Sequence, residues 1–348
     1  MTSLRTTLCE LFGIDVPIFN VGFGQSATPE LAAAVSNAGG CGVLGFSGGG
    51  MPPQEIRARI DRTRTLTDRP FGGNVIIAPL SSSTASEEDR AAVRARITAA
   101  IDARIPILVL FWGDPAPFIA AAHANGTKVV VQVGSPEEAA AAARSGVDAV
   151  IAQGVEAGGH VRATESIWTV LPRVVEAAGP VPVLAAGGIG DGRGIARALK
   201  LGAQGVSLGT RFVASSEAWV HERHKQRLVE AGVADTIFGT VFTVGWPDAP
   251  HRALRNKTVR EWEAAGRPPI GARPGEGEVI GTRHEGWGDF PFYRYGVGMV
   301  TPTFEGDLDH AVMWAGESVS AVTDVRPAAD IVRDLAREAE AALAMSYG

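Results

Sequence analysis

Between residues 16 and 213 the sequence repeats one pattern eight times: a short run rich in β-branched residues, then an Ala-rich segment of helical character. Such alternation is typical of a parallel sheet whose strands are joined by helices. Eight units predict an α/β protein of the (β/α)8, or TIM-barrel, class. The expected strands are residues 17–21, 42–45, 73–78, 106–110, 128–131, 149–152, 181–185 and 205–208.

The expected helices carry local boundary signals. Thr28, Asp114 and Ser135 each precede a proline, which places a capping side chain before a proline at the first helical position. Ser135 also fits a capping box with Glu138. Gly146 stands where the end of a helix requires a left-handed residue. These signals agree with the alternation of strands and helices.

The repeat ends near residue 213. Residues 214–300 are rich in Trp, Pro, Arg and Gly, which indicates a cap or lid inserted after the barrel units. Apolar residues then recur at i+4 spacing from Ile331 to Leu343, which predicts a final amphipathic helix that starts near Pro327 and packs back on the barrel. We therefore expect a cofactor-binding barrel over 1–213, a cap over 214–300, and a tail and helix over 301–348 that complete the barrel domain.

Composition restricts the class of protein. Hydrophobic residues make up 45% and charged residues 20%, so a large buried core is attainable. The net charge is −6 and no Lys/Arg block occurs, which argues against a nucleic-acid partner. Residues 31–54 are uncharged but contain seven glycines and two prolines, which argues against a membrane span.

The two cysteines, Cys9 and Cys41, lack CxxC spacing, which suits a reducing compartment. The N-terminus also lacks the apolar run of a signal peptide. We therefore expect a cytoplasmic protein. His221 and His224 have a spacing compatible with a metal pair, but no acidic third ligand stands nearby, so we expect structural roles for them and no metal site. The oligomeric state stays open.

Two glycine-rich loops follow the last two expected strands. Ala186, Gly187 and Gly188 come after the seventh strand, and Gly209 and Thr210 after the eighth. Barrels often bind phosphate between these two loops, because backbone N–H groups can approach the ligand closely there. Tight turns alone would also explain the glycines of one loop, but two adjacent loops favour a phosphate cup.

The loop after the sixth strand begins at Gln153 and ends with Gly158, Gly159 and His160. The carboxyl ends of barrel strands face the active site, so this loop can present Gln153 and His160 to a ligand. A histidine can accept or share a proton near neutral pH. An isolated loop histidine more often bonds backbone groups, but the position of His160 favours a catalytic role.

The first expected strand is followed by a G-x-G-x-x-A match at residues 22–27. A dinucleotide-binding fold would require an acidic residue about 20 positions later, where Leu44 and Gly45 stand. Gly22, Phe23 and Gly24 therefore predict a backbone contact with a flavin or a simple turn. Near other strand ends, Asn20, Asn74 and Gln132 could bond a heterocycle or phosphate or cap the sheet.

Taken together, residues 17–22, 29–40, 153–160, 186–188 and 209–212 resemble the nitronate monooxygenase family, formerly called 2-nitropropane dioxygenases. The resemblance implies an FMN-containing barrel that oxidises alkyl nitronates with O₂ to carbonyl compounds and nitrite. It places His160 at the family's active-site histidine, which deprotonates a nitroalkane or holds the nitronate. The implied FMN contacts are Gly22, Phe23, Gly24, Asn74, Gln132, Gln153, Gly158, Gly159, Ala186, Gly187, Gly188, Gly209 and Thr210, with Gln25 and Ser318 as further candidates.

The same scaffold and Gly-Gly-His loop occur in flavin-dependent enoyl-ACP reductases and NAD(P)H:quinone reductases. A reductase that uses NAD(P)H is therefore the main alternative to a nitronate oxidase. A flavin-binding sensor or scaffold with little turnover is an alternative of another class. The sequence leaves open the physiological substrate and whether NAD(P)H is a reductant.

Overall fold

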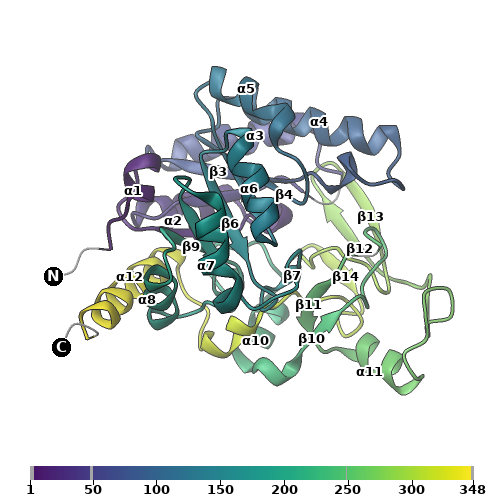
Figure 1. Ribbon diagram of the computed structural model, residues 1–348. Helices are drawn as coiled ribbons and strands as arrows, with labels where there is room; N and C mark the ends of the chain where they lie inside the picture. Colours follow the sequence, from purple (N-terminus) through teal and green to yellow (C-terminus); the bar gives the residue numbers. More distant parts are fainter. Residues whose placement is uncertain (1–3, 48–49, 248, 346–348) are drawn as a thin grey trace.

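The structure, a computed structural model, describes residues 4–47, 50–247 and 249–345. Its main sheet has eight parallel strands in the order β1-β9-β8-β6-β5-β4-β3-β2. A parallel bridge between Phe19 and Cys41 brings β2 back to β1, so the barrel nearly closes (Figure 1). The strands are β1 (Ile18–Asn20), β2 (Gly42–Gly45), β3 (Phe71–Ile76), β4 (Ile107–Phe111), β5 (Lys128–Val133), β6 (Ala149–Gln153), β8 (Val183–Ala186) and β9 (Gly205–Leu208).

The predicted TIM barrel is confirmed. The third strand begins and ends two residues earlier than expected, because residues 78–80 form a short 3-10 turn, η2 (Ala78–Leu80). The helices surround the barrel: α1 (Thr7–Phe12), α2 (Pro29–Asn37), α3 (Pro53–Leu66), α4 (Glu87–Asp102), α5 (Ala116–Ala124), α6 (Pro136–Ser145), α7 (Ile167–Ala178), α8 (Gly192–Lys200) and α9 (Thr210–Val213). In this arrangement each parallel strand reaches the same end of the barrel.

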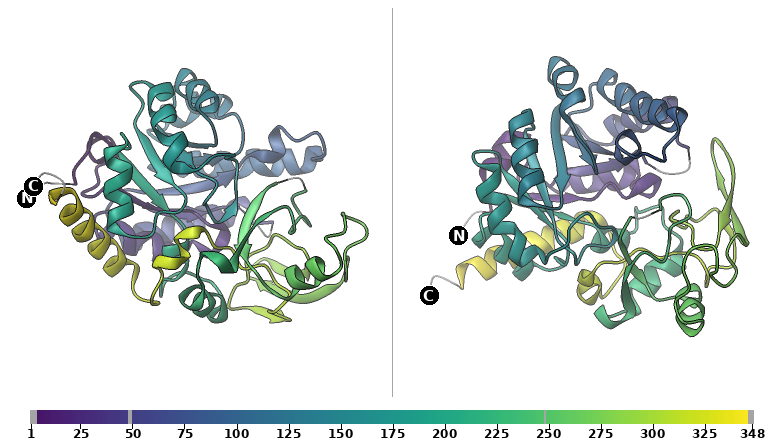
Figure 2. Two further views of the ribbon diagram at one scale, coloured as in Figure 1. Left: turned by 60° about the horizontal axis from the view of Figure 1, so that its bottom comes forward. Right: turned by 45° about the vertical axis from the view of Figure 1, so that its right-hand side comes forward.

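The final helix, α12 (Ala328–Ala344), packs on α8 and α2, as the i+4 pattern predicts. Figure 2 shows this yellow helix lying along the outside of the barrel. Ile331 and Leu335 on its inner face are buried. The described part of the chain contains no helix that is both long and apolar enough to span a bilayer.

Side chains cap the helices largely where the sequence indicates. The Thr28 hydroxyl accepts a hydrogen bond from the Leu31 N–H at 3.1 Å, and the Ser135 hydroxyl accepts one from the Glu138 N–H at 3.3 Å. The capping box also predicts that the Glu138 carboxylate accepts a hydrogen bond from the Ser135 N–H, and this prediction is wrong. The Glu138 carboxylate instead accepts from the Gly134 N–H at 2.8 Å and pairs with Arg162, because that guanidinium lies on the neighbouring loop.

Asn20 closes the seam between the first two strands. Its side-chain Nδ2 donates to the Val43 carbonyl at 2.9 Å, and its Oδ1 accepts from the Val43 N–H at 2.8 Å. The side chain is fully buried. Asn20 therefore satisfies backbone groups that the short β1 leaves unpaired, and its role is to cap the sheet.

The residues after β9 build a second layer at the carboxyl end of the barrel. Figures 1 and 2 show these elements, in green, gathered on one side of the strands. They are α10 (Glu222–Glu230), η3 (Val233–Asp235), β10 (Thr236–Gly239), β11 (His251–Leu254), α11 (Lys257–Ala264), β12 (Val279–Glu285), β13 (Gly288–Tyr293) and β14 (Phe304–Gly306). Their own core includes Phe242, Tyr295 and Val300. We refer to residues 214–314 as the cap.

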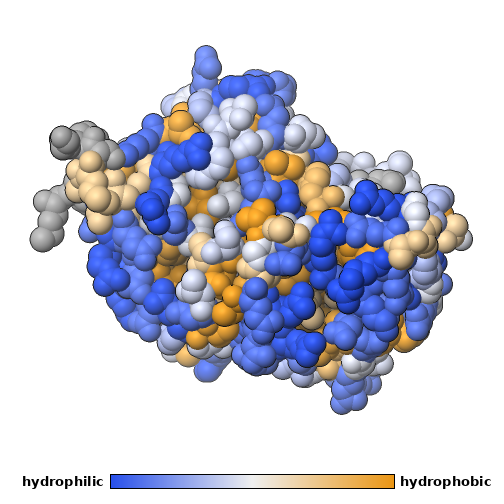
Figure 3. Space-filling model, turned by 90° about the horizontal axis from the view of Figure 1, so that it is seen from below, coloured by the Kyte–Doolittle hydropathy of each residue, from blue (hydrophilic) through white to orange (hydrophobic). Residues whose placement is uncertain are grey.

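The cap and the barrel share one small sheet. Its order is β10-β11-β7, and β7 (Gly159–His160) belongs to the barrel loop that follows β6. A second sheet, β13-β12-β14, lies within the cap. Hydrophilic side chains cover much of the face seen in Figure 3, and apolar side chains show between them toward the centre.

Candidate active site

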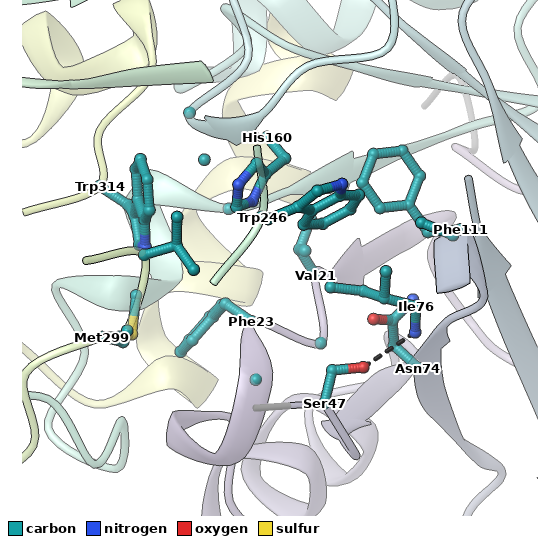
Figure 4. Close-up of a pocket in the computed structure, with 18 of the residues that line it drawn as sticks. Val21, Phe23, Ser47, Asn74, Ile76, Phe111, His160, Trp246, Met299 and Trp314 are labelled. Carbon is teal, nitrogen blue, oxygen red and sulfur yellow. Dashed lines mark hydrogen bonds between the residues drawn. The ribbon is translucent and has the colours of Figure 1, made fainter. Parts of the chain in front are cut away.

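A cavity of about 920 Å³ lies at the carboxyl ends of the barrel strands, between the barrel and the cap (Figure 4). Every residue that the family resemblance assigns to the site lines this one cavity. These residues are Gly22, Phe23, Gly24, Asn74, Gln132, Gln153, Gly158, Gly159, His160, Ala186, Gly187, Gly188, Gly209 and Thr210, together with Gln25 and Ser318.

Close backbone approaches explain several of the glycines. A Cβ atom at Gly22 would lie 2.4 Å from the Leu44 carbonyl oxygen and 2.6 Å from the Asn74 Cβ, so no larger residue fits without movement. Gly187 and Gly188 have φ angles of +104° and +67°, in the region that favours glycine. The wall of the cavity is therefore bare backbone at these positions.

Thr210 stands at the start of α9, beside the loop of Gly187 and Gly188. Its hydroxyl oxygen accepts a hydrogen bond from the Gly316 N–H at 2.9 Å. The hydroxyl proton is then available to a ligand oxygen. This arrangement of a hydroxyl and glycine backbone can hold an anion such as a phosphate.

Gln153 holds the loop that carries His160. Its Nε2 donates to the His160 carbonyl at 3.0 Å, and its Oε1 accepts from the Arg162 N–H at 2.7 Å. On the other side of the loop, His160 pairs with His251 in the ladder between β7 and β11. Gln153 thus lines the cavity mainly as a brace for His160.

The His160 ring lies between two tryptophans. Its centroid is 4.1 Å from that of Trp246 and 5.3 Å from that of Trp314. Part of the residue faces the cavity, but the Nε2 atom is buried and has no hydrogen-bond partner among the described residues. Desolvation, and then the charge of His251, lower the pKa of His160 to about 3. The imidazole is therefore neutral near pH 7 and has an unused ring nitrogen.

His251 has a defined tautomer. Its Nε2 accepts a hydrogen bond from the Phe242 N–H at 3.0 Å, so the proton is on Nδ1, which donates to the Ala249 carbonyl at 2.9 Å. Desolvation lowers the pKa of His251. One imidazole ring thus ties together both ends of residues 242–251, the segment that carries Trp246 against His160.

The sequence does not predict several other residues of the cavity wall. Ser47 and Ser207 lie at or near strand ends, so the rule that identified Asn74 could have found them. Trp314 and Met299 stand in irregular segments far from His160 in the sequence and carry no local signal. Further missed lining residues are Val21, Ile76 and Phe111.

The remaining sequence candidates have structural contacts. The Nδ1 of His221 accepts from the Arg223 N–H at 3.1 Å and caps α10. The buried His224 donates from Nε2 to the Trp314 carbonyl at 3.1 Å, and desolvation lowers its pKa to about 4. Within the described ranges, no three His, Cys, Asp or Glu side chains are grouped so that they could hold a metal ion.

The family profile of nitronate monooxygenase matches residues 5–338. The chain belongs to this family. It is 32% identical to the nitronate monooxygenase of Pseudomonas aeruginosa, over 94% of this chain and 97% of that protein. It is also 37% identical to the (3aS,4S,5R,7aS)-5-hydroxy-7a-methyl-1-oxo-octahydro-1H-indene-4-carboxyl-CoA dehydrogenase of Mycobacterium tuberculosis, over 76% of this chain and 70% of that enzyme.

Solved structures show the same barrel and cap. The structure of FabK from Thermotoga maritima has a TM-score of 0.80 and 33% identity, with 99% of both chains covered. The nitroalkane oxidase from Streptomyces ansochromogenes has a TM-score of 0.76 and 28% identity, covering 99% of this chain and 100% of that one. This chain is therefore an oxidoreductase of a flavin-dependent family.

Proposed function

We propose that this protein is an FMN-dependent nitronate monooxygenase, which oxidises an alkyl nitronate with O₂ to a carbonyl compound and nitrite. The observation that carries the proposal is the neutral His160 in the wall of the cavity, between Trp246 and Trp314. The 32% identity to the Pseudomonas aeruginosa enzyme over nearly the whole chain supports the reaction.

The cavity fits FMN. Small-molecule sites are commonly about 300–1,000 Å³, and about 920 Å³ is available here. Gly187, Gly188, Gly209 and Thr210 offer one phosphate cup at the place where barrels bind a terminal phosphate. One cup, with no dinucleotide fold beside it in the described part of the chain, favours FMN over FAD. When bound, the flavin supplies the two-electron oxidation of the substrate and the reaction with O₂.

The side chains bind and orient the ligands. The Thr210 hydroxyl and the glycine backbone hold the phosphate, and Gln153 fixes the loop of His160. A donor N–H on the imidazole can bond a nitronate oxygen, and the negative charge of that ligand raises the proton affinity of the ring. Trp246 and Trp314 exclude water from this contact, which strengthens it.

The low pKa of His160 favours one of its two expected roles. A general base works best when its pKa is near the working pH, and the pKa here lies several units lower. A nitronate is already deprotonated and requires no base. We therefore assign His160 to binding the nitronate rather than to deprotonating a neutral nitroalkane.

A second candidate function is a flavin-dependent reductase that uses NAD(P)H on an enoyl thioester or a quinone. The 37% identity to a carboxyl-CoA dehydrogenase favours a thioester as a possible substrate of this scaffold. The barrel alone does not decide, because one barrel supports many reactions through its loops.

One experiment separates the two functions. The oxidised flavoprotein is mixed anaerobically with an alkyl nitronate, with NADH and with NADPH, while the flavin absorbance is followed. We expect rapid bleaching by the nitronate alone, followed in air by nitrite release that tracks O₂ consumption. Bleaching by a nicotinamide, with no reduction by several nitronates, would transfer the assignment to the reductase.

A further inference from the structure

The cavity is also lined by α4 and the β12–β13 hairpin, and we call this part of its wall the outer part. This outer part is lined by Val93 and Arg96 of α4, by Thr84 just before that helix, and by Phe290 and Pro291 of the hairpin. Val93, Phe290 and Pro291 give this part of the wall apolar surface, and Arg96 gives it a cation.

Arg96 is a partly buried cation with few contacts. Its Nε donates to the Met51 carbonyl at 3.1 Å, and among the described residues no carboxylate oxygen lies within 4.0 Å of its guanidinium. Desolvation lowers the pKa of Arg96. Arg283 also lines the cavity, but its Nε lies 2.6 Å from the Glu285 carboxylate. Arg96 therefore has terminal nitrogens that can receive an anionic ligand.

The acid that faces Arg96 is already engaged. Asp89 lines the same part of the cavity, and its charge acts on Arg96 from beyond ion-pair distance. The Asp89 carboxylate accepts hydrogen bonds from the N–H and the hydroxyl of Ser86, at 3.0 and 2.6 Å, in the capping box of α4. Asp89 is thereby held at the start of its helix.

Arg96 lies across the barrel from the phosphate cup. The cup follows β8 and β9, whereas α4 follows β3. In the strand order of the barrel, β3 is three or more positions away from both β8 and β9 in either direction. An anion at Arg96 would therefore bind on the side of the barrel opposite the phosphate cup.

We propose that Arg96 is a second anion site, and that the substrate is an extended molecule. Its far end carries a carboxylate or a phosphate that binds Arg96, and an apolar stretch lies along Val93 and Phe290. The Arg96 site follows from the geometry of the outer cavity. Only the identity of the reacting end, a nitronate, rests on the function proposed above.

The test compares linear nitronates in pairs that differ only at the far end. One member of each pair ends in a methyl group, and the other ends in a carboxylate or a phosphate. The chain length is varied within each series. We expect the anionic member of a pair to have a KM lower by roughly 10- to 100-fold at the best length, the range for a hydrogen bond to a charged group. Arg96→Met should abolish this preference, and Arg96→Lys should restore part of it.

Arg94→Met is the matched control, because Arg94 is exposed on the same helix, pairs with Glu87 and does not line the cavity. It should keep the preference. A wild-type enzyme with no preference at any chain length would overturn the proposal, as would a preference that survives Arg96→Met or that Arg94→Met abolishes equally. Loss of flavin from Arg96→Met would also overturn it, because Arg96 would then hold the cofactor.

A binding measurement separates this inference from the proposed reaction. Alkyl phosphates and alkyl carboxylates without a nitro group are titrated into the flavin-loaded protein, and the flavin absorbance and tryptophan fluorescence are followed. We expect Arg96→Met to weaken binding about 10-fold or more relative to wild type. If no nitronate is turned over but this weakening is seen, the proposed function fails and the anion site stands. If neither anion binds the wild type, the site is refuted.

Discussion

The burial of His160 predicts an acid-sensitive contribution to stability. The folded-state pKa is about 3, whereas an unperturbed histidine titrates near 6.5. Between these values the unfolded chain binds a proton that the folded chain does not. The stabilisation is therefore fully present above about pH 6.5 and is lost as the pH falls toward about 3.

The magnitude follows from this difference. A pH of 5 lies about 1.5 units below the pKa of the unfolded histidine, and each unit corresponds to about 1.4 kcal/mol. His160 alone should therefore lower the free energy of unfolding by about 2 kcal/mol between pH 7 and pH 5. This is an upper value, because part of the residue faces the cavity, where water screens the charge.

The assay is urea unfolding of the flavin-saturated protein at pH 7, 6 and 5, for wild type and His160→Asn. His224 is also buried with a low pKa and acts in the same direction, but it is present in both proteins and cancels in the difference. The variant should lose up to about 2 kcal/mol less than wild type between pH 7 and pH 5. Equal losses in the two proteins would refute the assignment of a low pKa to His160.

Three further predictions concern the cofactor and the barrel. Denaturation should release FMN, and recovery of FAD alone by chromatography would contradict the single phosphate cup. His160→Asn should keep the flavin and lower kcat/KM for nitronates and nitroalkanes to a similar extent; a much larger loss with nitroalkanes would restore the role of a base. Asn20→Ala should lower the free energy of unfolding by about 1–3 kcal/mol in urea titrations, because it leaves the buried backbone of Val43 without partners; an unchanged midpoint would contradict its role at the seam.

The barrel half of the site could be predicted from the sequence because its signals are local. Gly22, Gly187 and Gly209 follow three of the strands, and Asn74 and Gln153 lie in the second half of two others. A closed parallel sheet brings the carboxyl ends of all its strands to one end. Once the eight strands are identified, these residues must meet. Their grouping around one cavity could therefore be predicted without knowing the distances between them.

The cap half could not be predicted in the same way. Trp314 approaches His160 from an irregular segment and His251 approaches it from β11, both about 90 or more residues away, and no periodic pattern links them to it. Glu138 is a second example. Its local motif predicts that its carboxylate accepts from the Ser135 N–H, but the carboxylate pairs instead with the Arg162 guanidinium, which comes from another loop. Long-range packing selected these contacts from several that the local sequence permits.

The ladder between β7 and β11 has a consequence for how the site works. The backbone of His160 belongs to a cap sheet, and the Val161 N–H donates to the Pro250 carbonyl at 2.7 Å in the same region. Trp246, Trp314 and His251, which surround the ring and lower its pKa, all come from beyond the barrel units. The barrel therefore supplies the loop and the phosphate cup, while the cap determines whether the imidazole is charged. Changes in the cap can then alter the reaction while the barrel loops are kept, because residues from both parts meet at the imidazole ring.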